Sequence, residues 1–262
     1  MKYLVFCSML IWGCHNASSN KQVPLGNEAD TLQIQKNMER QLLFDNDTIA
    51  IYRIDSVSYF EQRQKFYVEQ DTIPYIADFE QAKKILQGKV VFGGWNDGQR
   101  IIDSLLDGQM ISMVRFENGE VFDQNLQKGI FSDVYFVKYY PTEDIVLFEG
   151  GHTSDFSINL KNGLMDVEQV GNPDYIVHSP NKRYRLNGWF PGQECSSYFI
   201  QKQAEGEYLF CTGVPMHLTK EAFDLCTIGD VFWKSDQELY FRNTYYGNTD
   251  DERLGFFQLV LK

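Results

Sequence analysis

From about residue 110 to its end, the chain is a succession of short segments rich in aromatic and β-branched residues, and turn residues separate them. Short segments of this composition are typical of β-strands. The first two, residues 110–116 and 120–122, flank Asn118 and Gly119, which form a strong hairpin signal. A helix would need apolar residues at a period of about 3.6, which does not dominate this region. The sequence therefore predicts a fold made mainly of antiparallel β-strands.

The strand pattern after the hairpin divides into three similar units. In each unit the first strand ends in a turn, and these turns include Thr142, Asn181 and Asp236, which are 39 and then 55 residues apart. We expect the longer interval to contain an insertion with a short helix over residues 218–226, capped by Thr219. The predicted strands are residues 134–140, 144–148, 156–160 and 164–170 in the first unit, 175–178, 184–190, 197–201 and 208–211 in the second, and 231–233, 238–243 and 255–261 in the third.

The turn after the first strand of each unit resembles the Ser-Pro-Asp-Gly joint in the blades of periplasmic β-propellers, although no unit has Asp-Gly after a proline. The resemblance covers residues 134–261 and implies four-stranded blades of about 40–50 residues. The third unit has three strands, so a closed ring would take a fourth from the N-terminal half, for example residues 49–54. A β-sandwich or an open meander with a helix on it is the competing architecture. We predict a mainly β fold, propeller-like or otherwise multi-stranded and antiparallel, with one or two short helices.

The N-terminal half carries weaker patterns. Residues 31–44 have apolar side chains at helical spacing, and residues 49–54 and 65–69 have the composition of strands. The clearest helix begins after Asp78, which is a good N-cap, and ends at Gly88. We expect a single mostly β domain over residues 31–262, with a candidate internal boundary near residue 128.

The start of the chain has the pattern of an export signal. Residues 3–12 are an apolar run that is too short to cross a membrane as a helix, and a polar segment follows it. At the end of the run, Ile11-Trp12-Gly13-Cys14 resembles the lipobox of bacterial lipoproteins, although a small residue is usual where Trp12 stands.

The resemblance implies that residues 1–13 are a signal peptide, that the Cys14 thiol is acylated, and that residues 14–30 are a lipidated linker. Acyl chains would anchor the protein to the membrane of a Gram-negative cell envelope. In some such lipoproteins, acidic residues just after the cysteine direct export to the cell surface. Here the first acidic residue is Glu28, which implies a protein that faces the periplasm.

Five triplets have the form Asp, then Ser or Thr, then an apolar residue. They resemble the O-glycosylation sequon that one group of Gram-negative bacteria uses on exported proteins. The alternative interpretation is local structure, because Asp favours turns and Thr-Ile or Ser-Val favours the start of a strand. The candidate acceptors are Thr31, Thr48, Ser56, Thr72 and Ser104.

Three cysteines remain after Cys7 and Cys14, and in an oxidising compartment such thiols tend to pair. Cys195 and Cys211 lie on one predicted hairpin, but its turn places Cys195 opposite about Gly213. Small buried thiols are an equally good interpretation. The sequence therefore leaves the pairing among Cys195, Cys211 and Cys226 open.

No catalytic or metal-binding signature is present, since the chain lacks Cys-x-x-Cys, His-x-His and Gly-x-Ser-x-Gly. We therefore predict no catalytic residue, metal ligand or cofactor. His152 with Asp155, and Asp174 with His178 on one strand face, are weak candidates that turns or strands explain as well. Aromatic residues near predicted turns are the better candidates for binding; they are Trp95, Trp189, Tyr245 and Tyr246.

These features favour a membrane-anchored envelope lipoprotein with a non-catalytic role in recognising a protein or a glycan. The formal charge of −12 opposes nucleic-acid binding, because an acidic surface repels phosphates. One alternative is a periplasmic immunity-type protein that blocks a toxin. Another is a glycan-acting hydrolase, which would need two carboxyl groups about 5–9 Å apart in a cleft.

Overall fold

The structure is a computed structural model that describes residues 40–96, 99–101, 109–123, 134–193, 195–218, 225–244 and 255–262. The side chains of residues 94–96 and 99–101 and of His152 are outside this description. The described residues all belong to one compact unit, Glu39–Lys262. In the described part, no helix combines the length and apolar character that crossing a membrane requires.

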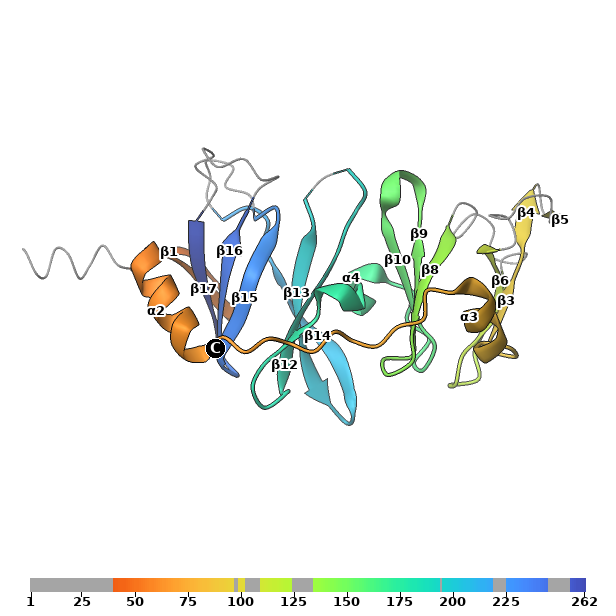
Figure 1. Cartoon of the computed structure of the whole chain (residues 1–262), viewed down its shortest axis with the longest axis horizontal. Coiled ribbons are helices and arrows are strands. Elements are labelled where there is room, and N and C mark those ends of the chain that lie inside the picture. The colour runs from red at the N-terminus through yellow and green to blue at the C-terminus, as the bar shows by residue number, and fades with distance from the viewer. Residues whose placement is uncertain are drawn as a thin grey trace, which may run out of the picture. The chain divides into compact units, whose positions relative to one another are not determined.

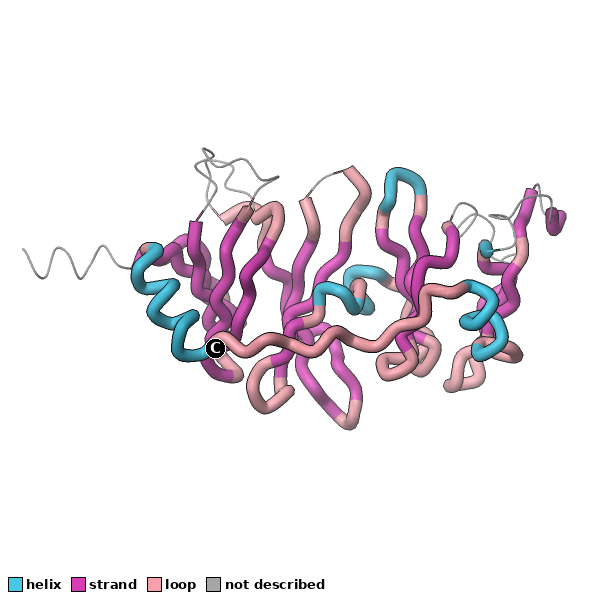
Figure 2. Tube along the Cα trace, in the orientation of Figure 1, coloured by secondary structure: helices cyan, strands magenta, loops and turns pink. Residues whose placement is uncertain are grey.

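The described part is mainly β, as the sequence predicts, with four antiparallel sheets of three or more strands, one two-stranded ribbon and three short α-helices (Figures 1 and 2). The helices are α2 (Ser56–Phe66), α3 (Phe79–Ile85) and α4 (Val167–Val170). The strands are β1 (Arg40–Asp45), β2 (Ile49–Ile54), β3 (Val90–Phe92), β4 (Gly94–Asn96), β5 (Gln99–Ile101), β6 (Ile111–Arg115), β7 (Val121–Asp123), β8 (Tyr135–Tyr140), β9 (Ile145–Glu149), β10 (Asp155–Asn159), β11 (Val177–His178), β12 (Tyr184–Trp189), β13 (Ser197–Ala204), β14 (Glu207–Val214), β15 (Ile228–Ser235), β16 (Glu238–Asn243) and β17 (Gly255–Leu261).

The larger sheets have the strand orders β3-β6-β7, β10-β9-β8, β11-β12-β13-β14 and β1-β2-β17-β16-β15. Figure 1 shows them side by side, with the first strands β1 and β2 in the same sheet as the last strands β15, β16 and β17. β2 pairs antiparallel with β17, with Ile51 opposite Leu259. The prediction that the third unit takes a strand from residues 49–54 is therefore confirmed. The described sheets do not close into a barrel or a propeller.

Apolar side chains between neighbouring sheets form the core. One cluster lies between the five-stranded and four-stranded sheets and includes Ile51, Leu259 and Ile200. A second cluster joins α3 to the sheets that contain β6 and β9, and it includes Leu86 and Phe148. Burial of apolar surface therefore stabilises the two junctions at which these clusters lie.

The N-cap predicted for α3 is confirmed, whereas the helix ends at Ile85, before the predicted end at Gly88. Asp78 is the N-cap, and its carboxylate accepts a hydrogen bond of 2.7 Å from the Gln81 N–H. Gly88 follows the helix with a positive φ of 89°, a conformation that glycine adopts without strain. The predicted hairpin is also present, as β6 and β7.

The strand predicted at residues 65–69 is wrong, because residues 56–66 form α2. Asp55 caps this helix by accepting hydrogen bonds from the Ser58 N–H at 2.8 Å and the Ser58 hydroxyl at 2.6 Å. The helix buries Tyr59 and leaves Val57 and Phe60 exposed. It therefore lacks the regular apolar stripe from which a helix can be predicted in a sequence.

Two further predictions differ from the structure. Residues 164–170 do not form a strand, because Asp166 accepts a hydrogen bond of 3.0 Å from the Glu168 N–H and caps the short helix α4. The helical spacing over residues 31–44 does not correspond to a helix in the described residues, because residues 40–45 form the strand β1 and pair with β2. Residues 219–224 of the predicted helix over 218–226 lie outside the described residues.

The cysteine pairing that the sequence left open is Cys195 with Cys226, and Cys211 is a half-buried free thiol. The disulfide ties the segment before β13 to the segment before β15, across 31 residues of sequence. It therefore links the four-stranded sheet covalently to the five-stranded one.

Candidate functional site

The segment from residue 67 to residue 77, which we name the strap, leads from α2 to α3. Figure 1 shows it as the orange trace that passes across the intervening sheets. Its attachments include a hydrogen bond of 3.3 Å from the His178 N–H to Gln70 Oε1. Near its far end, Ile76 and Tyr139 exchange two backbone hydrogen bonds of 2.8 and 2.9 Å. Most strap side chains are exposed, so the strap crosses the sheets without being buried by them.

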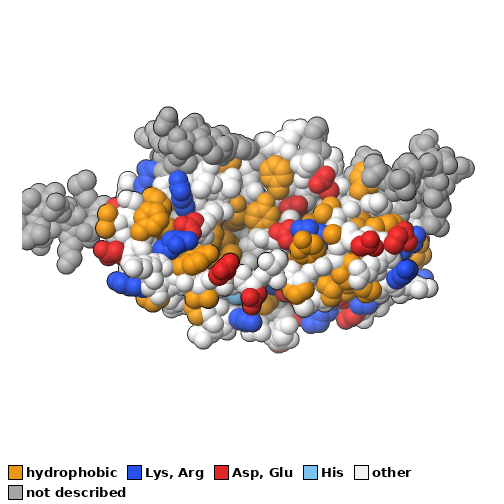
Figure 3. Space-filling model, viewed as in Figure 1, with side chains coloured by type: hydrophobic (Ala, Val, Ile, Leu, Met, Phe, Trp, Pro, Cys, Tyr) orange, Lys and Arg blue, Asp and Glu red, His pale blue; other side chains and the backbone are white. Residues whose placement is uncertain are grey.

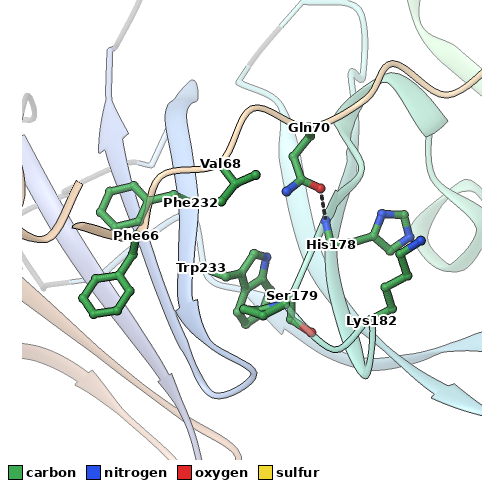
Figure 4. Close-up of a pocket in the computed structure, with 9 residues that line it drawn as sticks. Phe66, Val68, Gln70, His178, Ser179, Lys182, Phe232 and Trp233 are labelled. Carbon is green, nitrogen blue, oxygen red and sulfur yellow. Dashed lines mark hydrogen bonds between the residues drawn. The ribbon is translucent and has the colours of Figure 1, made fainter. Parts of the chain in front are cut away.

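A pocket of about 300 Å³ opens where the strap meets two sheets (Figure 4). Three segments that are far apart in sequence form it: the end of α2 with the strap, the turn before β12, and β15. Its lining residues are Phe66, Val68, Gln70, His178, Ser179, Pro180, Lys182, Phe232 and Trp233. A cavity of this size that combines aromatic and aliphatic side chains with several polar groups has the composition of a binding pocket.

The apolar wall of the pocket is rigid. Phe232 and Trp233 come from β15 and are 2% and 4% exposed. The indole N–H of Trp233 donates a hydrogen bond of 3.0 Å to the Val177 carbonyl, which fixes the ring against β11. Because these side chains are already ordered, a ligand would pay little entropy for arranging them.

The polar edge comes from the turn before β12. Ser179 and Lys182 close this turn with a backbone hydrogen bond of 2.9 Å, at the joint that the sequence predicts around Pro180. The His178 ring packs edge-on against Tyr208, with 5.5 Å between ring centroids. Burial, assisted by the charge of Arg185, lowers the pKa of His178 below its ordinary value of 6.5. The imidazole is therefore uncharged at neutral pH and can both donate and accept hydrogen bonds.

Exposed apolar side chains lie beside the pocket. Phe66, Tyr67 and Val68 are consecutive and exposed, with Val68 at 69%, and Val57 and Phe60 are exposed on α2. Figure 3 shows hydrophobic side chains reaching the surface over α2 and along the strap, between charges of both signs. A group of apolar side chains beside a pocket is typical of an interaction surface. This surface was not predicted from the sequence, because residues 65–69 have the composition of a strand.

Among the described residues, none of the aromatic side chains that the sequence suggests for binding lines this pocket. Trp189 is half-buried and is the last residue of β12, whereas the turn that lines the pocket precedes the first residue of this strand. Trp95 lies in β4, where its side chain is outside the description, and Tyr245 and Tyr246 lie outside the described residues.

The weak acid–base candidates have structural partners. Asp155 accepts a hydrogen bond of 2.7 Å from the Phe190 N–H, and burial raises the pKa of its carboxyl above the ordinary value of 3.8. Asp174 does not share a strand face with His178, because it lies in a 3-10 turn at Pro173–Tyr175 and forms an ion pair with Lys138 at 2.5 Å. No group of three His, Cys, Asp or Glu side chains in the described part could hold a metal ion.

The candidate modification sites differ in exposure. Thr48 is half-buried in the turn before β2, whereas Ser56 is exposed at the first position of α2 and Thr72 is exposed on the strap. In the triplet of Ser56, local structure explains the aspartate, because Asp55 is the N-cap of α2. Thr72, by contrast, lies in no helix or strand. Cys14, Thr31 and Ser104 lie outside the described residues.

Comparison with known proteins gives no match to a protein family, to a curated protein or to a solved structure.

Proposed function

We propose that this protein is a lipid-anchored lipoprotein of a Gram-negative cell envelope that acts by binding a protein partner at the pocket beside the strap. The observation that carries the proposal is the apolar pocket next to the exposed run from Phe66 to Val68. Exposed apolar residues around a rigid aromatic pocket are characteristic of sites where a partner inserts an anchoring side chain.

The chemistry of the pocket favours an apolar anchor with a neutral polar neighbour. Phe66, Val68 and Trp233 supply apolar contact, while Gln70 supplies a neutral amide at the edge. Burying an apolar side chain there would contribute about 1.5–3 kcal/mol to binding. The remaining affinity would come from contacts along the strap.

An immunity-type inhibitor is the second candidate, since it too would bind one protein partner. The net charge of −12 favours a partner with a basic surface through electrostatic steering. A glycan-acting hydrolase would need two carboxyl groups in one cleft. The residues that line this pocket include neither Asp nor Glu, so the hydrolase proposal finds no support there.

The partner proposal is tested by photo-crosslinking in the membrane-anchored protein. A photoreactive residue at Val68 is compared with one at Leu209, an exposed apolar position on β14 that does not line the pocket. We expect one discrete protein adduct from position 68 and none of that size from position 209. Val68→Asp should abolish co-purification of the partner, whereas Leu209→Asp should not. Equal labelling at both positions, or no adduct at position 68, contradicts the proposal.

The anchor proposal is supported by the lipobox-like residues around Cys14, and the disulfide is compatible with an oxidising compartment. Cys14→Ser is expected to move the protein from the membrane fraction to the soluble fraction, with Cys211→Ser as the matched control. If the Cys14→Ser variant still sediments with membranes, the lipid anchor is excluded.

Glycosylation is proposed at Thr72 before the other described candidates, because Thr72 is exposed on a segment without regular structure. Thr72→Ala should increase mobility in a denaturing gel, while Thr48→Ala, at a half-buried position, should not. Unchanged mobility when all five candidate residues are replaced would exclude this modification.

A further inference from the structure

A second hollow lies on the face of the five-stranded sheet against which α2 packs. Tyr59 is fully buried between this helix and the sheet, and its ring contacts Phe232 and Phe256 at centroid distances of 5.4 and 4.7 Å. Strand pairing places Tyr52, Gln258 and Tyr240 in one row across β2, β17 and β16. This row carries polar groups next to the apolar contacts of the helix.

The hollow is a groove of about 410 Å³ between α2 and this row. Its lining residues are Arg40, Ile54, Ser58, Gln62, Lys234, Glu238, Tyr240, Gln258 and Val260. None of them lines the pocket beside the strap. The groove is therefore a separate site, and its function can be tested separately.

The carboxylate of Glu238 is held in place from one side. Its Oε2 accepts hydrogen bonds from Lys234 Nζ at 2.9 Å, from Gln258 Nε2 at 2.9 Å and from the Tyr240 hydroxyl at 3.4 Å. Burial and the neighbouring Glu238 raise the pKa of Tyr240 to about 12, so its hydroxyl remains protonated. A carboxylate has about four acceptor positions, so a fixed Glu238 retains acceptor capacity for a ligand in the groove.

Hydrogen-bond donors also line the groove. Lys234 contributes an ammonium group, Gln62 an amide from α2, and Arg40 a guanidinium that lies 3.4 Å above the ring of Tyr52. Ile54 and Val260 add apolar surface. Lys234 and Glu238 form an ion pair at 2.9 Å, so these two polar groups together carry no net charge. Hydroxyl groups donate and accept at once and match such an array.

We propose that the groove binds a neutral saccharide. The hydroxyls of a sugar would donate to Glu238 and accept from Lys234 and Gln62, and the C–H face of the ring would lie on Val260 and Ile54. The proposal assigns to the protein a ligand site in addition to the partner surface at the strap.

The test uses the full chain in a detergent without a sugar headgroup. Maltose, cellobiose, lactose, chitobiose and mannobiose are titrated by calorimetry and by saturation-transfer NMR. We expect at least one of them to bind and to bind more tightly than glucuronic acid or glucosamine. Binding of none of the five, or tighter binding of the charged sugars, overturns the proposal.

Two glutamines of α2 provide matched variants. Gln62 lines the groove, whereas Gln64 is exposed and does not line it. Gln62→Ala should weaken saccharide binding about three- to tenfold through the lost hydrogen bond, and Gln64→Ala should leave it unchanged. Equal affinities of the two variants would place the sugar elsewhere and overturn the proposal.

Val68→Asp separates the two sites. It should abolish partner binding at the strap and leave saccharide binding unchanged, because Val68 does not line the groove. Loss of saccharide binding in this variant would overturn the assignment of the sugar to the groove. This conclusion would hold whether or not the variant also loses the protein partner.

Discussion

Arg185 is a charged side chain with 3% of its surface exposed, and it touches elements of two sheets. From β12 it donates hydrogen bonds of 2.7 Å to Glu143, in the turn after β8, and 2.7 Å to Gln201 on β13. Its guanidinium also lies 4.0 Å above the ring of Tyr208 on β14. A buried charge is tolerated when it is paired and hydrogen-bonded in this way.

Removing this charge should therefore be costly. Arg185→Met leaves Glu143 without its ion-pair partner and removes one of the two hydrogen bonds that Gln201 Oε1 accepts. We expect a loss of about 3–5 kcal/mol in the free energy of unfolding. Arg183→Met, at an exposed position two residues away, should change it by less than about 0.5 kcal/mol. Adding Glu143→Leu to Arg185→Met should recover part of the loss. Urea unfolding measures all three, and similar stabilities of the Arg185 and Arg183 variants would contradict the role assigned here.

Asp155 gives the stability a dependence on pH. Burial raises the pKa of its carboxyl in the folded state above 3.8, so the folded protein holds this proton more tightly than the unfolded chain does. This contribution to stability is therefore lost as the pH rises from 3.8 through the raised folded pKa. Asp155→Asn should have a higher free energy of unfolding than the parent protein at pH values above this window. Below the window, the difference between the two proteins should become small.

Asp55 provides the opposite case. Hydrogen bonds from Ser58 lower the pKa of Asp55 below 3.8, so its contribution is present above 3.8 and is lost as the pH falls through the folded pKa. Asp55→Asn should thus lose part of its stability at neutral pH. Urea unfolding at a series of pH values compares the two variants. A stability difference at Asp155 that does not change with pH would be inconsistent with this account.

Among the elements, the disulfide between the segments before β13 and β15 is the clearest constraint. It closes a loop of 31 residues, and by loop entropy it contributes about 3–4 kcal/mol. Replacing both Cys195 and Cys226 by Ala should lower the free energy of unfolding by this amount and remove its sensitivity to reductant. Cys211→Ala, at the free thiol, should retain that sensitivity. A reductant effect that survives the double replacement would rule out this bridge as its cause.

The elements also show what could be predicted from the sequence. Strands with turn residues on both sides, such as Glu238–Asn243 and Gly255–Leu261, were predicted with their observed bounds. In these segments, alternation and turn chemistry are local signals and agree with the tertiary structure. The strand that residues 49–54 supply to the third unit was found because that unit lacked one.

Helix α2 could not be predicted in this way. Its apolar residues Val57 and Phe60 are exposed and only Tyr59 is buried, so the periodicity that marks a helix is absent. The pocket was missed for the same reason, since it depends on where α2 ends and the strap begins. The position of Trp233 opposite Val68 arises from packing between sheets, which a single sequence does not encode locally.

At the scale of the whole described unit, the sheet that contains β2 and β17 is the element that joins the two halves of the chain. Ile49 and Ile51 of β2 are fully buried in it. A chain shortened to begin at residue 55 loses β1 and β2, and should expose this core and fail to unfold cooperatively. A chain that begins at residue 46 loses only the edge strand β1 and should remain folded.

Thermal unfolding followed by circular dichroism measures the difference between the two shortened chains. A cooperative transition at the parental temperature in the chain that begins at residue 55 would show that β17 does not need β2. The comparison depends on one strand alone, because both chains keep α2, the strap and every later element.

The pairing of β2 with β17 also sets an order of events during synthesis. A ribosome completes residue 51 long before residue 259, its partner in the sheet. Until β17 emerges, one edge of β2 has no partner, and such an edge is prone to pair with other chains or to attract proteases. A copy that is terminated before Gly255 never closes this edge. A copy whose translation stops before β17 is therefore expected to aggregate or to be degraded more readily than a copy that contains this strand.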